Sequence, residues 1–268
     1  MDSNKSFDNY TTLRKHQLRI LEIVKAFDDI CQRHSIPYWI EGGTLLGAVR
    51  HKGFIPWDDD LDVQILYKDL KHLRKILEKE LPDNFVIQTN KTDKYYLRHL
   101  LRIRDINSLL YVSNKGDWSD YKYQGVFIDI FAMDSSLFLL TRIRKFCHIM
   151  YWKRIMMWGR LLKKNKDFKR LLFYPWFKLE TFIASVFILL GKLFFPNRMT
   201  YCQYGIDYNG LELSKEDIFP LKRVRFENIF LNAPNKSFEI LTRVYGDYMK
   251  LPPIDEQKPN HSINVIFK

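Results

Sequence analysis

The chain has 268 residues, 46% of them hydrophobic, which is enough to bury one large core or two small ones. Its three cysteines, Cys31, Cys147 and Cys202, lie far apart and lack metal-ligand spacing. This usage argues against a disulfide framework or a cysteine zinc site, and it indicates reduced thiols. The net charge of +12 indicates an anionic partner or a solvated basic face.

The start of the chain and its apolar runs indicate where the protein resides. The stretch from Met1 to Asn9 is polar and lacks the basic-then-apolar order of a secretory signal. No uninterrupted apolar run reaches the roughly 20 residues that a membrane-spanning helix needs. We therefore expect a cytoplasmic protein.

The first elements are a helix, a short strand and a second helix. Apolar residues recur at largely helical spacing over Thr11–His34, and the apolar run Pro37–Ile40 predicts a buried strand. A second helical pattern begins at Thr44, so Gly42 and Gly43 lie at a strand-to-helix turn. Backbone N–H groups at such a turn, at the positive end of a helix, bind phosphate oxygens. We predict that both glycines and the Thr44 hydroxyl bind a phosphorylated substrate.

An acidic strand follows the second helix. Residues 60 to 65 alternate between polar and apolar types, which predicts a half-buried strand with Asp60 and Asp62 on one face. Two neighbouring carboxylates repel each other and stay ionised readily only around a cation. We therefore predict Mg²⁺ or Mn²⁺ at this pair, since both ions take oxygen ligands and often share them with substrate phosphates. Asp58 is expected to contribute to substrate binding, by fixing the loop or by holding outer-shell waters.

Each of these two features has a plainer interpretation when it is taken alone. A Gly-Gly pair is most often only a turn, and an acidic cluster at the start of a strand is most often a solvated loop. Their combination within about twenty residues, with a strand, a helix and a strand between them, is what favours a functional site.

A third acid lies in the middle of an apolar strand pattern, Gly125–Phe131. Burying an unpaired carboxylate costs several kcal/mol, so Asp129 needs a partner. One interpretation is an ion pair with an arginine at position 98, 102 or 104. The other is that Asp129 faces the same metal as Asp60 and Asp62, as a ligand or as the base that deprotonates an attacking hydroxyl.

Two arginines are candidates for binding a diphosphate. Arg50 follows the glycine turn by less than two helical turns, and Arg102 lies on a predicted strand, Tyr96–Ile103. Guanidinium groups bind phosphate oxygens through paired hydrogen bonds. Pairing with acids at the surface is the alternative for both.

The remaining pattern predicts further helices and strands. A helix is expected around Leu70–Leu77 and around Phe238–Tyr245, and a strand pair around Val224–Leu231, before a tail marked by prolines. Further short strands are predicted at Phe85–Gln88 and Leu109–Val112. A mixed sheet with flanking helices, an α/β (α+β) fold, follows from this order.

The basic charge is concentrated in one block. Residues 141–200 hold 14 lysines and arginines but only two acids, and they also contain the apolar run Thr181–Gly191. A helix in an anionic membrane surface would explain both the charge and the run, whereas nucleic acid would explain only the charge. We expect a membrane surface as partner and no nucleic acid, with an ordinary helical subdomain as the alternative.

The motifs together carry a resemblance. The run from Gly42 to Val63 resembles the signature of the LicD family of phosphotransferases, which includes fukutin and fukutin-related protein and belongs to the nucleotidyltransferase superfamily. In that superfamily a glycine turn precedes an Asp-x-Asp pair, with a third acid on a later strand, here Asp129. Further motifs resemble the C-terminal pattern of the family: Phe226-Glu227, Ala233-Pro234, Tyr245-Gly246-Asp247-Tyr248, Leu251-Pro252-Pro253 and His261.

The resemblance implies a nucleotidyltransferase-like fold and an activity. Members transfer a phospho-alcohol from a CDP-linked donor to a hydroxyl of a cell-surface glycan, such as teichoic acid, lipopolysaccharide or capsule. Phosphocholine from CDP-choline is the first expectation, and ribitol phosphate or glycerol phosphate are alternatives. Asp60, Asp62 and Asp129 would be the catalytic and metal-binding residues, and Gly42, Gly43, Thr44, Arg50, Asp58 and Arg102 would bind substrate.

Two alternative functions remain open, and the sequence also predicts how the chain divides into segments. The rivals are nucleotidyl transfer to a small molecule, and an inactive glycan- or membrane-binding protein of the same fold. We expect a catalytic core at 1–135, a basic and apolar helical segment at 136–200, and a C-terminal part at 201–268 that completes the catalytic domain. A glycan acceptor linked to lipid would place the protein at the inner face of the membrane.

Overall fold

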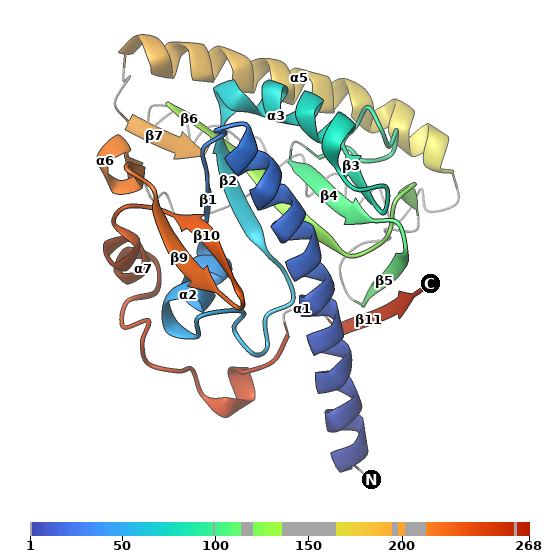
Figure 1. Ribbon diagram of the computed structural model, residues 1–268. Helices are drawn as coiled ribbons and strands as arrows, with labels where there is room; N and C mark the ends of the chain where they lie inside the picture. The colour runs from blue at the N-terminus through green and yellow to red at the C-terminus, as the bar shows by residue number, and fades with distance from the viewer. Residues whose placement is uncertain are drawn as a thin grey trace.

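A mixed sheet of seven strands lies at the centre of the molecule (Figure 1). This computed structural model describes residues 2–98, 100–113, 120–135, 165–194, 198–201, 213–259 and 262–268. The main path of the sheet runs β1–β2–β6–β4–β3, and β7 and β8 extend it beside the end of β6. The strands are β1 (Tyr38–Ile40), β2 (Asp62–Leu66), β3 (Phe85–Gln88), β4 (Leu101–Asp105), β6 (Phe127–Ser135), β7 (Arg198–Tyr201) and β8 (Leu213–Ser214).

The pair β2–β6 is parallel, and every other pair in the sheet is antiparallel. Val63 of β2 and Ile130 of β6 are register partners, and both are fully buried. Strands covered on both faces read as apolar runs, which explains the sequence of β6. The same register places Asp62 next to Asp129, at the N-terminal ends of the two strands.

Among the described residues, three long helices accompany the sheet. They are α1 (Asp2–Arg33), α3 (Tyr67–Glu80) and α5 (Lys166–Phe194). In Figure 1, α1 crosses in front of the sheet, and Ile20, Val24 and Phe27 of α1 are fully buried. The helix begins at Asp2, earlier than the predicted start at Thr11, because polar residues before the apolar pattern continue its first turns. Among the described residues, no helix is both long and apolar enough to cross a membrane.

The C-terminal elements pack around the start of the sheet. The hairpin of β9 (Lys222–Phe226) and β10 (Ile229–Ala233) lies against β1, and α2 (Gly42–Arg50) packs between β9 and α7 (Ser237–Tyr245). Two short helices, α6 (Lys215–Ile218) and η2 (Ile254–Glu256), complete this region. The tail predicted after the prolines is wrong in part, because β11 (Ser262–Phe267) forms an antiparallel pair with β5 (Ser108–Ser113).

The predicted α+β fold is confirmed, and so are most of its elements. The strand predicted over Tyr96–Ile103 is shorter, because the Tyr96 N–H donates to the Asp93 carbonyl at 3.0 Å in a turn and β4 begins only at Leu101. Residues 136–164 of the predicted basic segment lie outside the described residues. The division into three segments stays a prediction.

Gly125, just before β6, has almost no room for a side chain. An added Cβ would lie 1.8 Å from the backbone oxygen of Asp105, so Gly125→Ala forces the backbone apart and should lower the urea midpoint strongly. Gly246→Ala is the control: its Cβ would meet nothing within 4 Å, and only the left-handed backbone at φ 66 should cost about 1 kcal/mol. Equal losses in the two variants would contradict the close approach at Gly125.

Candidate active site

The glycine turn begins α2 and is tied to the acidic strand. Gly42 is the first residue of the helix and has a left-handed backbone at φ 55, which glycine adopts without strain. The Asp62 N–H donates to the Thr44 hydroxyl oxygen at 2.9 Å. The predicted phosphate-binding turn and the predicted metal-binding strand are therefore neighbours in space.

Asp60 and Asp62 are both partly exposed, whereas Leu61 and Val63 between and after them are fully buried. The predicted half-buried strand is confirmed only in part, because β2 begins at Asp62, which leaves Asp60 in the preceding loop, and Gln64 is buried. The pKa of Asp62 is raised well above its ordinary value by burial, and then by the charges of Asp60 and Asp129 and of further carboxylates nearby. Asp62 is thus at the centre of a field of like charges.

Asp58 joins this group from the loop before the strand. Its carboxylate lies above the start of α2, where a Cβ on Gly43 would come 2.8 Å from Asp58 Oδ2. Burial and the charges of Asp60 and Asp59 raise the pKa of Asp58 to about 8. In the described part of the chain, Asp58, Asp59 and Asp60 are the three acids whose oxygens lie within 4.8 Å of one another. The predicted metal ligands were Asp60, Asp62 and Asp129. The structure instead brings Asp58, Asp59 and Asp60 closest together, and only Asp60 belongs to both sets.

Asp129 has an arginine partner. Arg102 Nε and Nη2 donate to its two carboxylate oxygens at 2.5 and 2.9 Å, across the register pair that joins β4 to β6. Burial alone lowers the pKa of Arg102, but Asp129 more than offsets this and holds it above the ordinary value. The Arg102 guanidinium lies 3.9 Å from the centroid of the Phe127 ring and is almost fully buried. The ion pair that was one interpretation of Asp129 is therefore present. A role of Asp129 as metal ligand or base stays a prediction.

Arg50 connects α2 to the segment after α7. Its guanidinium donates to the Tyr248 carbonyl at 2.7 Å, and its Nε donates to His51 Nε2 at 2.9 Å. Burial lowers the pKa of Arg50 from its ordinary value. The predicted phosphate ligand thus also holds the C-terminal segment against the site.

Sequence reasoning missed two groups beside the carboxylates. Glu41, the buried residue just before Gly42, accepts a hydrogen bond from Gln64 Nε2 and contributes to the raised pKa of Asp62. Tyr245, the last residue of α7, has a pKa raised to about 12 by burial and by nearby carboxylates, Asp58 and Glu41 first among them. Two sequence features could have identified these residues: Glu41 lies next to the glycine pair, and Tyr245 belongs to a C-terminal motif.

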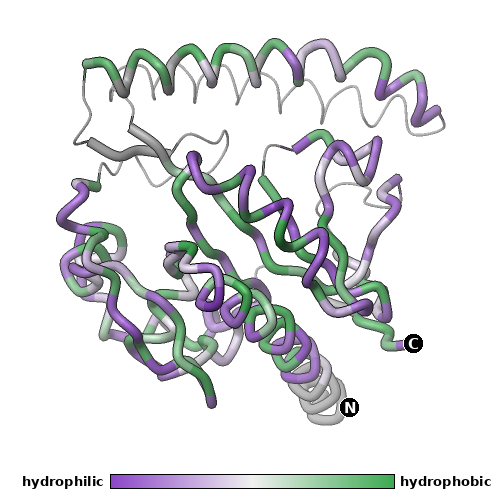
Figure 2. Tube along the Cα trace, turned by 45° about the horizontal axis from the view of Figure 1, so that its top comes forward, coloured by the Kyte–Doolittle hydropathy of each residue, from purple (hydrophilic) through white to green (hydrophobic). Residues whose placement is uncertain are grey.

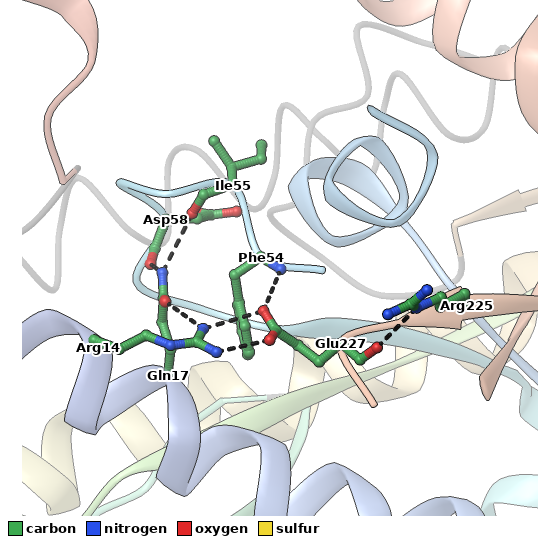
Figure 3. Close-up of polar contacts among 7 residues, drawn as sticks. All are labelled: Arg14, Gln17, Phe54, Ile55, Asp58, Arg225 and Glu227. Atoms are coloured by element: carbon green, nitrogen blue, oxygen red, sulfur yellow. Dashed lines mark hydrogen bonds and ion pairs between the residues drawn. The ribbon is translucent and has the colours of Figure 1, made fainter. Parts of the chain in front are cut away.

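The loop that carries the acids is held from two distant parts of the chain (Figure 3). From α1, Gln17 Nε2 donates to the Asp58 carbonyl at 2.9 Å and to the Ile55 carbonyl at 3.2 Å. From the turn after β9, Glu227 accepts from the Phe54 N–H at 3.2 Å and from Arg14 of α1 at 2.7 and 3.0 Å. These bonds fix the backbone on which the carboxylates stand.

Comparison with known proteins assigns the chain to a family. A model described as LicD/FKTN/FKRP, nucleotidyltransferase domain, matches residues 35–156, which include the glycine turn, the acidic strand and Asp129. The lipopolysaccharide cholinephosphotransferase LicD of Haemophilus influenzae is 32% identical over 265 residues, covering 93% of this chain and 96% of that protein. The chain belongs to the LicD family.

More distant LicD relatives match shorter stretches. Ribitol 5-phosphate transferase FKRP of Homo sapiens is 40% identical over 47 residues, which are 18% of this chain and 10% of that protein. Mannosyltransferase regulator 4 of Saccharomyces cerevisiae is 29% identical over 82 residues, 29% of this chain and 7% of that protein. The resemblance seen in the motifs is thereby confirmed.

The residues of this LicD-family site suit a divalent cation. The donor set consists of carboxylate oxygens, which magnesium and manganese prefer. Burial first, and then the neighbouring carboxylates, raise the pKa values of Asp58 and Asp62, and a dication between these groups would relieve the repulsion between them. Asp58, Asp60 and Asp62 are the residues that would hold it.

Carboxylate repulsion should make the metal-free protein sensitive to pH. Because the folded protein holds the Asp62 proton more tightly than the unfolded chain does, stability should fall as pH rises from about 4, the ordinary aspartate pKa, through the raised pKa. Asp62→Asn removes the carboxyl group that titrates. The melting temperature of this variant in EDTA should therefore fall less, as pH rises, than that of the wild type. Added Mg²⁺ should raise the wild-type melting temperature more than that of the variant.

Asp83→Asn is the control for this experiment, since Asp83 is exposed and lies outside the site. Its melting curves should follow those of the wild type at every pH. Parallel pH dependence in the wild type and Asp62→Asn would exclude Asp62 as a source of the repulsion.

The clamp on the acidic loop can be tested at Glu227. Glu227→Ala removes the acceptor of the Phe54 N–H together with the ion pair to Arg14, and leaving the Phe54 N–H without this acceptor should cost about 1 to 3 kcal/mol in unfolding free energy. Arg225→Ala is the matched control, because Arg225 is exposed and donates to the backbone carbonyl of Glu227 rather than to its carboxylate, so the unfolding free energy should stay within about 0.5 kcal/mol of the wild type. Chemical denaturation measures the unfolding free energy of both variants. An equal loss of stability in the two would show that Glu227 does not hold the loop.

Proposed function

We propose that this chain transfers a phospho-alcohol, phosphocholine in the first place, from a CDP-linked donor to a hydroxyl of a cell-surface glycan. The match over almost the whole chain to a lipopolysaccharide cholinephosphotransferase carries this proposal. The carboxylates beside a glycine-started helix support it, because this arrangement suits a diphosphate with its metal. A CDP-alcohol donor and a metal requirement are parts of the proposal.

The reaction is a substitution at phosphorus. The acceptor hydroxyl oxygen attacks the phosphorus that carries the alcohol, the bond from that phosphorus to the bridging oxygen breaks, and CMP leaves. A magnesium or manganese ion held by the carboxylates would neutralise the diphosphate and the charge developing on CMP. The first turn of α2, with Gly42, Gly43 and Thr44, would bind diphosphate oxygens.

The remaining site residues would orient the acceptor and take its proton. Asp129 is the proposed base, and the two bonds from Arg102 hold its carboxylate in one orientation. Arg50 would contribute positive charge near the donor and, through Tyr248, fix the segment that follows α7. The Tyr245 hydroxyl, close to the acids, would bind substrate oxygen.

A second alcohol has support of its own. The short match to a ribitol 5-phosphate transferase covers 18% of this chain, so ribitol phosphate is the first alternative to phosphocholine. Glycerol phosphate transfer and nucleotidyl transfer are further alternatives within the same chemistry. An inactive binding protein is the alternative without any turnover.

We also place the reaction at the inner face of the membrane, with the protein bound peripherally. Lipopolysaccharide, which the Haemophilus relative acts on by name, is a glycan with a lipid anchor. A basic block of 14 lysines and arginines in residues 141–200 supports a position near anionic lipid.

The deciding experiment identifies the products. The purified protein is given CDP-choline, CDP-ribitol and CDP-glycerol with Mg²⁺ and a glycan extract, and mass spectrometry follows CMP and the glycan. We expect CMP release together with a gain of phosphocholine on glycan. Release of pyrophosphate from a nucleoside triphosphate would instead indicate nucleotidyl transfer, and no turnover with any donor would favour the inactive binding protein.

The same assay tests the metal residues. Asp60→Asn should lower turnover by at least about a hundredfold, since it removes a ligand next to the transferred phosphoryl group, and excess EDTA should do the same to the wild type. The exposed Asp83→Asn should keep wild-type turnover. Full activity in EDTA would overturn the metal requirement while leaving transfer itself in place.

A further inference from the structure

The outer face of α5 exposes a row of large apolar side chains. We use this name for Phe168, Leu171, Leu179, Phe182, Leu189 and Leu193, which are between 48% and 71% exposed. On the other side of the helix, Phe173 and Phe177 are 4% and 5% exposed and pack against the protein. Figure 2 shows that much of α5 is coloured hydrophobic, and the exposed fractions place apolar side chains both on the face that the protein covers and on the face that it leaves open.

Such a surface is unusual for a protein that meets only water. The row recurs at steps of three, four, seven and eight residues, which is the spacing of one helix face. With 29 residues at 1.5 Å each, α5 is about 43 Å long, and the row runs as a strip from its first turn to its last. Contiguous apolar surfaces beyond a few hundred Å² mark sites where another molecule or a membrane binds.

The charges around the strip decide between its possible occupants. Helix α5 itself carries five lysines and arginines against two acids, and its Lys166 and Lys178 are exposed. One of those acids, Asp167, is paired with Lys94 at 3.0 Å. A second copy of the chain would bring two such basic helices together, whereas an anionic lipid surface complements the charge and accepts the apolar strip.

The side chains of the strip also fit a lipid interface. Trp176 lies beside it and is 47% exposed, and tryptophan prefers the boundary between lipid head groups and acyl chains. Lysine side chains such as that of Lys178 can extend their charge toward phosphate groups while their carbon stems remain near apolar surface. The helix therefore has the composition of one that lies in the plane of the interface.

We propose that the outer face of α5 inserts into the interface of an anionic membrane, with the helix parallel to the surface. The carboxylates lie at the N-terminal ends of β2 and β6, whereas β7, which follows α5 in the chain, pairs with the C-terminal end of β6. Docking through α5 therefore leaves the catalytic end of the sheet accessible. The inference is independent of the proposed reaction, because it rests on α5 and is tested without any substrate.

The first test is sedimentation of the full chain with vesicles. The wild type should bind vesicles of phosphatidylglycerol and phosphatidylcholine, bind phosphatidylcholine alone far less, and dissociate as salt rises. Leu171→Glu/Phe182→Glu should weaken binding at least about tenfold, because each substitution replaces an exposed apolar side chain that would enter the lipid with a charged one. The control Phe230→Glu/Ile254→Glu changes side chains that are 56% and 87% exposed elsewhere, and should bind like the wild type.

A second measurement needs no charged substitution. Phosphatidylglycerol carrying brominated acyl chains should quench tryptophan emission of the wild type, and Trp176→Phe should lose most of that quenching. Absence of vesicle binding at low salt, or equal loss in the control pair, would overturn the proposal. So would a dimer in sedimentation velocity that Leu171→Glu/Phe182→Glu converts to a monomer without any change in vesicle binding.

Failure here and failure of the proposed reaction are separate outcomes. CMP release with a soluble oligosaccharide acceptor reports on the carboxylate site alone, and Leu171→Glu/Phe182→Glu should leave it unchanged. A protein that turns over donor but does not bind vesicles would contradict only the membrane proposal.

Discussion

Repulsion among closely spaced carboxylates is the constraint on which the site depends. Asp58, Asp60 and Asp62 stand together at one end of β2, with Glu41 beside them, and the pKa of Asp62 shows how strongly burial and like charges disfavour its ionised form. An isolated loop would relieve such repulsion by moving apart. This loop is held in place from outside, and a divalent cation, as proposed above, would relieve the repulsion that remains.

The holding groups come from elements that share no local sequence. Gln17 of α1 bonds the loop backbone on one side, and Glu227 bonds it through Phe54 on the other while pairing with Arg14. The sheet adds a second support, because parallel pairing of β2 with β6 sets Asp62 beside Asp129. Arg102 then offsets one of the negative charges in the field. Position and charge are thus fixed by different parts of the fold.

The sequence pattern predicted local elements such as turns and strands. It could not predict which distant segments pair with one another. The glycine turn and the acidic strand follow from residue order, and a lone acid in an apolar strand had to have a partner. Choosing Arg102 among three arginines needs the register of β4 against β6, which no single segment encodes. Pairing of β11 with β5 joins segments far apart in the chain, and Tyr245 reaches the acids only through the packing of α7. Such contacts depend on the whole fold rather than on a pattern.

The ion pair between Arg14 and Glu227 has a consequence for biosynthesis. Its partners are 213 residues apart, so this part of the clamp on the acidic loop forms only after Glu227 has left the ribosome. Until then the nascent chain has the bonds from Gln17 to hold the loop, but not those from Glu227. A polypeptide that stops short of Glu227 therefore keeps the acidic residues but lacks one of the supports of their loop.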